Sequence, residues 1–225
     1  MKLGEKRDTG DSEGIVIETS VVDKKYLREE NIKSILAHFL GEQEQIPPMY
    51  SAIKINGKKL YEYARRGQRI KIEPRKIKIF NIELIDIDKE RQEISFKVQC
   101  SKGTYIRSLC EDIALKLHTV GFMKELKRTQ VGEFSITKSI SIQDLEKKFD
   151  DEDFLDKYFI STEDILKEKN NISISNKKIR QFLNGIKLKY QLDDGIYKIY
   201  NENNEFIGIG NIKNKELKRD IIVNE

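Results

Sequence analysis

The sequence predicts an α+β fold, with a mixed, largely antiparallel sheet, helices packed against it, and a small β-rich domain at the C-terminal end. Three observations predict it. Two long segments alternate between apolar and polar residues over 75–100, apolar residues then recur at helical spacing over 106–117, and the pattern changes again at Ile172. A chain of 225 residues can form one large and one small domain, which we place at 1–160 and 161–225.

The N-terminal residues predict a strand, a turn, a second strand and a helix. Residues 1–4 resemble the tail of a strand, and residues 8–14 are rich in turn-forming Asp, Gly and Ser. A strand is expected from Ile15. The apolar spacing over 29–40 predicts a helix, and Gly41 suits the position just after its end.

A stiff loop and a short basic helix come next. Pro47-Pro48 favours an extended backbone, because a residue that precedes proline avoids the helical conformation. Tyr50 on this loop is either an exposed RNA contact or a packed anchor for the loop, and the residues alone do not decide. Residues 57–66 predict a short basic helix that ends at Gly67.

Residues 75–87 and 93–100 predict two strands of an antiparallel hairpin joined by a polar turn. The alternation slips near Phe80, which indicates a β-bulge. We therefore expect a long, bent hairpin at the centre of the sheet.

The stretch that follows the hairpin, Gln99 to Leu109, carries the most distinctive chemistry. It turns through Gly103 into a helix for which Thr104 is a plausible N-cap. Tyr105 and Arg107 lie off the apolar stripe of that helix, so a ring and a guanidinium could face a cleft and hold a base and an anion. The alternative is an ion pair of Arg107 with Glu111 on a solvated face.

The remainder predicts short elements. They are a helix over 119–130, a strand over 131–134, two acidic helices capped by Ser141 and Thr162, a helix over 176–184, and strands at 186–190, 196–200 and 206–212 with a turn at Asn203-Asn204.

Charge is unevenly distributed although the net charge is only +4. Residues 54–78 contain ten Lys or Arg, opposed by Glu62 and Glu73 alone, while acidic residues dominate 144–168. The basic stretch is either a footprint for a polyanion or a solvated face.

Several kinds of protein are disfavoured. Cys100 and Cys110 lie at apolar positions typical of small core residues in a reducing compartment, and His38 and His118 are isolated, so no metal site is expected. No signal peptide or membrane-spanning run is present, and we expect a cytoplasmic protein.

Five strings in a fixed order resemble the TruB family, the tRNA pseudouridine-55 synthases. They are LG-x-x-x-DTGD-x-EG at 3–14, IPPMYSAIK at 46–54, GKKLYEYARRG at 57–67, CSKGTYIRSL at 100–109 and LKRTQVGEF at 126–134. The string FIGIG at 206–210 weakly resembles the small PUA-like domain at the C-terminal end of that family.

The resemblance implies a pseudouridine synthase-like fold and an isomerase. Such an enzyme detaches uracil 55 of the tRNA TΨC loop from its ribose and reattaches it through carbon 5. It implies that the enzyme needs no cofactor and no metal. It also implies a monomer that binds the T-arm of tRNA and does not bind a membrane. By motif position, Tyr105 contacts the flipped uracil, Arg107 pairs with the catalytic aspartate and Leu126 lines the pocket. The residues expected to bind the substrate RNA are Tyr50, Lys54, Lys58, Lys59, Leu126 and Arg128.

One departure from the family pattern concerns catalysis. The family's catalytic aspartate lies in a loop of the form GxLDPxAxG, whereas none of the three prolines here follows an aspartate. We expect an N-terminally truncated synthase that is inactive alone, with Asp8, Asp11 and Asp112 as poor substitutes and with Arg107 displaced toward solvent or Glu111. The alternative is a non-catalytic tRNA-binding or chaperone module.

Overall fold

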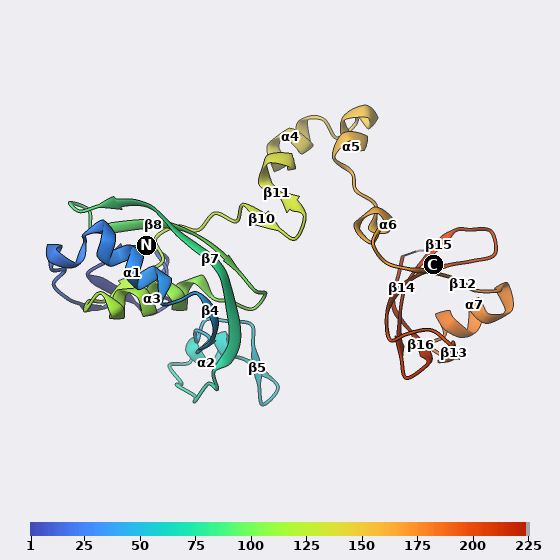
Figure 1. Ribbon diagram of the computed structural model, residues 1–225, viewed down its shortest axis with the longest axis horizontal. Helices are drawn as coiled ribbons and strands as arrows, with labels where there is room; N and C mark the ends of the chain where they lie inside the picture. Colours follow the sequence, from blue (N-terminus) through green and yellow to red (C-terminus); the bar gives the residue numbers. More distant parts are fainter. Residues whose placement is uncertain (224–225) are drawn as a thin grey trace. The chain divides into compact units, whose positions relative to one another are not determined.

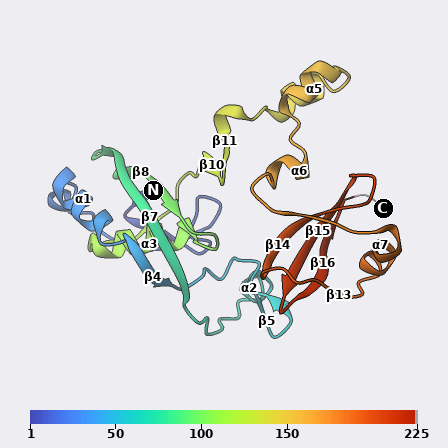
Figure 2. The same cartoon turned by 45° about the vertical axis from the view of Figure 1, so that its right-hand side comes forward.

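The structure is a computed structural model that describes residues 1–223 and comprises two compact units (Figures 1 and 2). Unit 1 is Met1–Arg128 and unit 2 begins at Thr129. The boundary predicted between residues 160 and 161 stays a prediction. Among the described residues, no helix has the length and apolar character needed to cross a bilayer.

Unit 1 consists of nine strands, three α-helices and one 3-10 helix. In chain order they are β1 (Lys2–Leu3), β2 (Glu5–Arg7), β3 (Val16–Thr19), η1 (Lys24–Tyr26), α1 (Glu29–Ala37), β4 (Gly41–Gln45), β5 (Lys54–Ile55), β6 (Lys58–Lys59), α2 (Leu60–Ala64), β7 (Arg75–Asp88), β8 (Glu93–Cys100), α3 (Ile106–Lys116) and β9 (Gly121–Phe122).

The central sheet of unit 1 has the strand order β4-β7-β8-β1-β9, and every neighbouring pair is antiparallel. The predicted hairpin of β7 and β8 is confirmed. Its register shifts between Ile79 and Asn81, which leaves Phe80 as the extra residue of a β-bulge. This is the bulge that the slip in apolar–polar alternation near Phe80 predicted. Since an extra residue bends a strand, β7 curves along its length, as Figure 1 shows.

Helices α1 and α3 lie side by side on one face of this sheet (Figure 1). Their apolar stripes explain the packing: Ile32 and Leu36 from α1, and Leu109 and Ile113 from α3, are buried in one core. Leu3 of β1 is also fully buried in that core. The core therefore fixes α3, whose first turn carries Arg107.

Unit 2 contains a second sheet and a connecting segment of short helices. Its elements are β10 (Gln130–Val131), β11 (Phe134–Ser135), η2 (Ile136–Lys138), α4 (Ile142–Lys147), α5 (Glu152–Tyr158), α6 (Thr162–Ile165), β12 (Asn171–Ser173), α7 (Asn176–Leu183), β13 (Leu188–Lys189), β14 (Gly195–Tyr200), β15 (Phe206–Lys213) and β16 (Glu216–Ile222).

The sheet of unit 2 has the order β12-β14-β15-β16-β13, and its β12-β14 pair is parallel while the others are antiparallel. The mixed, largely antiparallel α+β fold is thereby confirmed. Phe182 of α7 is fully buried among the apolar side chains of this sheet. The predicted turn at Asn203-Asn204 is confirmed by the left-handed φ of +61° at Asn204, a conformation that asparagine tolerates.

The prediction of a helix over residues 119–130 is wrong. Gly121 and Phe122 form β9, and Gly121 lies so close to Ala114 and to the Lys2 carbonyl that no side chain fits there. Pairing with β1 therefore overrides the local spacing. The strand expected over 131–134 is instead a hairpin of β10 and β11 around Gly132.

Several predicted boundaries are also wrong. Tyr105, not Thr104, occupies the N-cap of α3, and Ser161, not Thr162, caps α6 by accepting a hydrogen bond from the Asp164 N–H at 3.0 Å. Gly41 begins β4 rather than ending the helix before it. The predicted basic helix is only the five residues of α2, and strands β4, β12 and β16 were not predicted at all.

Strand β3 exposes an apolar edge. It pairs with β2 alone among the described strands. Ile15, just before the strand, is 70% exposed, and Ile17, within the strand, is 51% exposed. Unpaired edges of β-branched residues promote intermolecular pairing. We expect Ile17→Lys to slow aggregation, measured by light scattering at 37 °C. Leu115→Lys is the control, because it adds the same charge at an exposed apolar site on a helix. Equal slowing by both variants would contradict the assignment to the strand edge.

Candidate active site

The site is built around the turn that connects β8 to α3. The turn predicted at Gly103 is present, and Gly103 adopts the left-handed conformation, with φ of +85°. The Ser101 hydroxyl accepts a hydrogen bond from the Lys78 N–H at 2.9 Å, and the Ser101 N–H donates to the Lys78 carbonyl at 2.8 Å. These two bonds attach the turn to β7 and so fix the direction in which α3 begins.

Arg107, in the first turn of α3, contacts three acceptors from two distant segments. Its Nη1 donates to the Thr9 carbonyl at 3.1 Å and to Asp11 Oδ2 at 3.2 Å, and its Nη2 donates to the Tyr50 carbonyl at 2.7 Å. The side chains of Arg107 and Asp11 are only 22% and 20% exposed, so water screens this pair little. The expected shift of Arg107 toward solvent or Glu111 is therefore wrong.

The local fold of the Asp8–Gly14 turn places Asp11 opposite Arg107. Gly10 has φ of +77°, and the Met123 N–H donates to its carbonyl at 3.0 Å. The other carboxylate oxygen of Asp11 accepts from the Thr9 hydroxyl at 2.7 Å and from the Glu13 N–H at 3.2 Å. Both oxygens of Asp11 are thus engaged, and the carboxylate positions the arginine from a rigid turn.

The guanidinium of Arg107 keeps unused hydrogen-bonding capacity. It carries five N–H donors, and three take part in the bonds described above. Among the described residues the Nε–H and one Nη2–H have no hydrogen-bond acceptor, and two donors suit one further carboxylate. The arrangement can therefore hold a second anionic group beside Asp11.

Tyr105 precedes α3 and is held by a buried amide. The Gln45 side chain accepts from the Tyr105 N–H at 2.8 Å and donates to the Tyr105 carbonyl at 3.0 Å. Gln45 is only 4% exposed, and these two bonds satisfy its amide. The backbone that carries the Tyr105 ring is consequently rigid, while the ring itself is half-buried.

The proline-stiffened loop is tied to α3 at both ends. Ser108 Oγ donates to the Ile46 carbonyl at 3.1 Å, and Arg107 donates to the Tyr50 carbonyl. The Tyr50 side chain is half-buried. The structure thus brings Arg107, Tyr105 and the backbone of Tyr50 together, with Tyr50 an anchor of the loop through its carbonyl.

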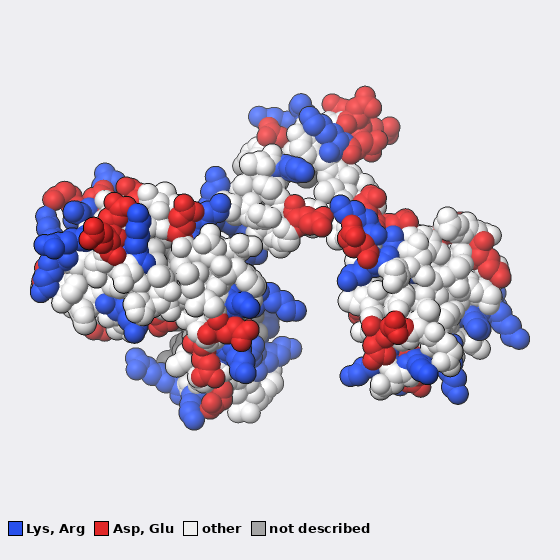
Figure 3. Space-filling model, viewed as in Figure 1, with Lys and Arg blue, Asp and Glu red and all other residues white. Residues whose placement is uncertain are grey.

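Three predicted RNA-binding lysines lie on the β5-β6 hairpin. Lys54 pairs with Lys59 across the hairpin, and Lys58 lies beside them at the turn. Lys54 and Lys58 are exposed, whereas Lys59 is half-buried. Figure 3 shows basic side chains projecting around the part of unit 1 that holds β5 and α2, and acidic ones gathered on α5.

Leu126 and Arg128 lie apart from this cluster. Both are exposed near the end of unit 1, and Leu126 is 55% exposed. Within residues 1–223 neither makes a hydrogen bond or an ion pair with Arg107 or Tyr105. The structure does not bring these two predicted residues to the site.

Burial alters three ionisable groups on α3. It raises the pKa of Glu111, an effect that Lys6 at 3.9 Å opposes, and it raises the pKa of the neighbouring Asp112. Burial also raises the pKa of the Cys110 thiol to about 12, so Cys110 is an inert core residue, as predicted. No group of three or more His, Cys, Asp or Glu placed to hold a metal ion occurs within residues 1–223.

Two contributors to the site were missed from the sequence. Asp11 was considered as a turn residue and as a poor substitute for the catalytic aspartate, but not as a partner of Arg107, and Gln45 was not considered. The signal for Gln45 is weak: it continues an alternation with Gln43 that ends at Pro47. The pairing of Asp11 with Arg107 spans 96 residues, which local spacing cannot reveal.

Three family models together match almost the whole chain. The model described as "TruB family pseudouridylate synthase (N terminal domain)" matches residues 1–106. The "tRNA pseudouridylate synthase B C-terminal domain" matches residues 107–167, and "Pseudouridine synthase II TruB, C-terminal" matches residues 171–218.

Curated relatives carry the name tRNA pseudouridine synthase B. That of Clostridium kluyveri is 42% identical over 224 residues, covering 97% of this chain and 74% of the relative. That of Clostridium tetani is 42% identical over 222 residues, covering 96% of this chain and 73% of the relative.

Solved structures share the fold. The "Crystal Structure of a Cbf5-Nop10-Gar1 Complex" matches with a TM-score of 0.56 and 23% identity, covering 82% of this chain and 55% of that chain. A structure titled "Structure of H/ACA RNP bound to a substrate RNA containing 2'-deoxyuridine" matches with a TM-score of 0.54 and 22% identity, covering 82% and 54%. The chain thus spans about half the length of these two.

Proposed function

Because the chain belongs to the TruB family of pseudouridylate synthases, we propose that it is the larger part of a tRNA pseudouridine synthase that isomerises uridine 55 of the TΨC loop. The family follows from relatives 42% identical along nearly the whole chain. The observation in the structure that best supports the activity is Arg107, rigidly held and with two donors left for one more carboxylate.

The proposed reaction is an isomerisation whose atoms balance without a cofactor or metal. The bond from ribose C1′ to uracil N1 breaks and a bond from C1′ to C5 forms. C5 loses its proton and N1 gains one. A base must leave the RNA stack for this, so a pocket with an aromatic ring and a basic clamp suits it.

The proposed roles follow from position. Tyr105, with its backbone fixed by Gln45, presents its ring to the flipped uracil. Arg107 holds the catalytic aspartate with its two remaining donors, and Asp11 keeps the guanidinium oriented. Leu126 lines the base pocket once RNA is bound. We further propose a cytoplasmic monomer that needs no metal or cofactor.

The catalytic aspartate itself is proposed to lie outside these 225 residues. None of their prolines follows an aspartate, as the GxLDPxAxG loop requires. Asp11 does not replace it, because both oxygens of its carboxylate are already bonded inside unit 1. The same absence favours a second candidate, a module that binds and remodels tRNA without chemistry.

The proposed position of modification can be mapped directly. The chain joined at its N-terminus to a segment carrying a GxLDPxAxG loop, here called the extended chain, is incubated with a tRNA transcript. Pseudouridine is then located by carbodiimide labelling and primer extension. We expect one modified site, uridine 55. Modification elsewhere contradicts the substrate assignment, and none at all favours the non-catalytic module.

Lys54, Lys58 and Lys59 of the β5-β6 hairpin are proposed to contact RNA phosphates, together with Tyr50 and Arg128. We expect the double variant Lys58→Glu, Lys59→Glu to bind tRNA more weakly. The slope of log affinity against log salt should become shallower by about 2, since each phosphate contact contributes about 1. Filter binding at roughly 50–300 mM salt measures both the affinity for tRNA and the salt slope.

The matched control for this variant is Lys24→Glu with Lys25→Glu, which makes the same charge change on η1 at exposed positions. Its salt slope should stay at the value of the unsubstituted chain. An unchanged slope in the Lys58, Lys59 variant would show that the hairpin is only a solvated face.

A further inference from the structure

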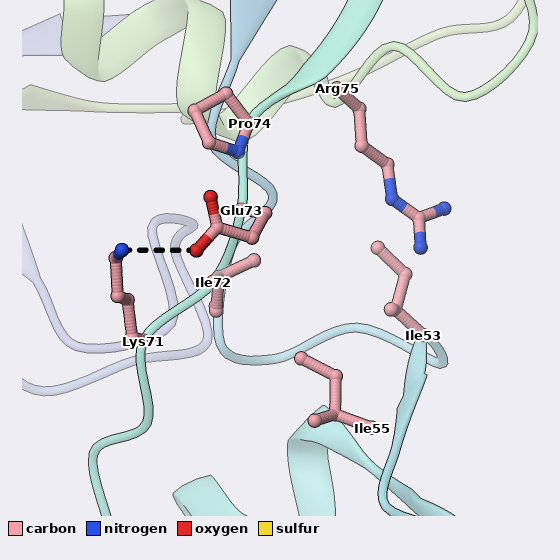
Figure 4. Close-up of a pocket in the computed structure, with 7 residues that line it drawn as sticks. All are labelled: Ile53, Ile55, Lys71, Ile72, Glu73, Pro74 and Arg75. Atoms are coloured by element: carbon pink, nitrogen blue, oxygen red, sulfur yellow. Dashed lines mark ion pairs between the residues drawn. The ribbon is translucent and has the colours of Figure 1, made fainter.

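A pocket distinct from the Arg107 site lies between the stretch before α2 and the stretch before β7. Its volume is about 270 Å³ (Figure 4). That is just below roughly 300 Å³, the low end of pockets that hold small organic ligands. Its lining residues are Ile53, Ile55, Lys71, Ile72, Glu73, Pro74 and Arg75.

The apolar part of the pocket comes from two extended segments that face each other. Ile53 and Ile55 come from one segment and Ile72 and Pro74 from the other, and all four line the pocket. The first segment is fixed by α2. The Leu60 N–H donates to the Ile53 carbonyl at 2.8 Å, and the Tyr63 hydroxyl donates to the Ile55 carbonyl at 3.2 Å.

Charged groups surround this apolar surface without covering it. Lys71 and Glu73 form an ion pair of 3.1 Å on one side, and the Arg75 side chain extends along the other (Figure 4). No ion pair within residues 1–223 engages Arg75. A flat ring inserted there would pack against the isoleucine side chains and could stack on the Arg75 guanidinium, and its polar edge would meet Lys71 and Glu73.

The charge of the surrounding segment selects the class of ligand. Residues 54–78 carry ten basic and two acidic side chains, so a polyanion is attracted and an apolar peptide gains nothing from the field. An RNA nucleotide combines a flat apolar base with an anionic backbone. We propose that this pocket holds one unpaired nucleobase of the bound RNA, separate from the base that reacts at Arg107.

This inference rests on the proposed function, because it assumes a tRNA T-arm as the ligand. Stacking in an apolar pocket and phosphate contact differ in one measurable respect. Phosphate contacts release counterions and change the salt dependence of binding, whereas a base in an apolar pocket does not. The salt slope therefore separates the pocket from the neighbouring lysines.

The test measures binding of a fluorescein-labelled T-arm stem-loop to the full 225-residue chain by anisotropy. Ile72→Ala should weaken binding about fivefold to tenfold, because it removes apolar surface that would contact the base, with the salt slope unchanged. Ile70→Ala is the control, because Ile70 lies in the same segment and does not line the pocket. Thermal unfolding confirms that both variants fold.

A second arm alters the RNA and leaves the protein intact. Each unpaired loop nucleotide is replaced in turn by an abasic one. One abasic replacement should weaken binding as much as Ile72→Ala does. With that abasic RNA, Ile72→Ala should weaken binding by less than a further twofold, because the two changes remove the same contact. Additive losses at every position would overturn the pocket assignment and leave the function standing. Failure of the unsubstituted chain to bind the stem-loop would overturn both.

Discussion

Arg107→Lys in the extended chain is expected to lower kcat by about 100-fold or more, with tRNA affinity within about threefold of the parent. The expectation follows from the number and direction of donors. Arg107 uses three to hold Thr9, Asp11 and Tyr50 and has two left, whereas lysine offers three in total on a freely rotating head. A lysine at this position cannot hold both its structural partners and an incoming carboxylate.

The assay for this variant is single-turnover pseudouridine formation, with affinity measured separately by filter binding. Arg91→Lys is the matched control, because Arg91 is exposed and its one ion pair within residues 1–223 is with Asp88, three residues away. Its kcat should equal that of the parent. Normal turnover in the Arg107 variant would contradict the proposal that Arg107 holds the catalytic aspartate. An equal loss of affinity and turnover would assign Arg107 to RNA binding instead.

Gly121→Val is expected to destabilise unit 1 by about 2–3 kcal/mol, the cost typical of overpacking a core. A side-chain carbon at Gly121 would lie 2.8 Å from the Ala114 methyl group and 2.9 Å from the Lys2 carbonyl oxygen. One contact is helix α3 and the other is backbone of β1, so neither can yield without moving α3 from the sheet. Thermal unfolding should show a drop of roughly 10 °C in the transition of unit 1.

Gly195→Val provides the comparison for this effect. A carbon added at Gly195 meets only the Tyr197 ring, at 3.7 Å, which is an ordinary contact. Both positions lie in strands and receive the same side chain. If the two variants lose equal stability, the cost is general to valine at a strand glycine and the close packing of α3 on β9 is not its cause.

Patterns confined to one or two elements were predicted well. The slip of alternation at Phe80 predicted a bulge that the register of β7 and β8 confirms, because pairing across a hairpin depends on residues close in the chain. The turns at Gly103 and at Asn203-Asn204 were predicted for the same reason, since each depends on the backbone of a few neighbouring residues.

Features that depend on distant contacts were not predicted. The residues after His118 have helical spacing, yet pairing of β9 with β1 makes Gly121 part of a strand. Arg107 was expected to lose its partner, yet the turn around Gly10 presents Asp11 to it. In both cases the partner lies about a hundred residues away, where a pattern read along the chain carries no information.

Release of tritium from uracil labelled at C5, in a T-arm stem-loop, tests the central claim most directly. The measurement compares the 225-residue chain with the extended chain at equal concentration. We predict that only the extended chain releases tritium, since we propose that Arg107 and Tyr105 bind and orient and that the catalytic carboxylate comes from the added segment. Release by the 225-residue chain alone would contradict this account and assign the chemistry to a carboxylate within it.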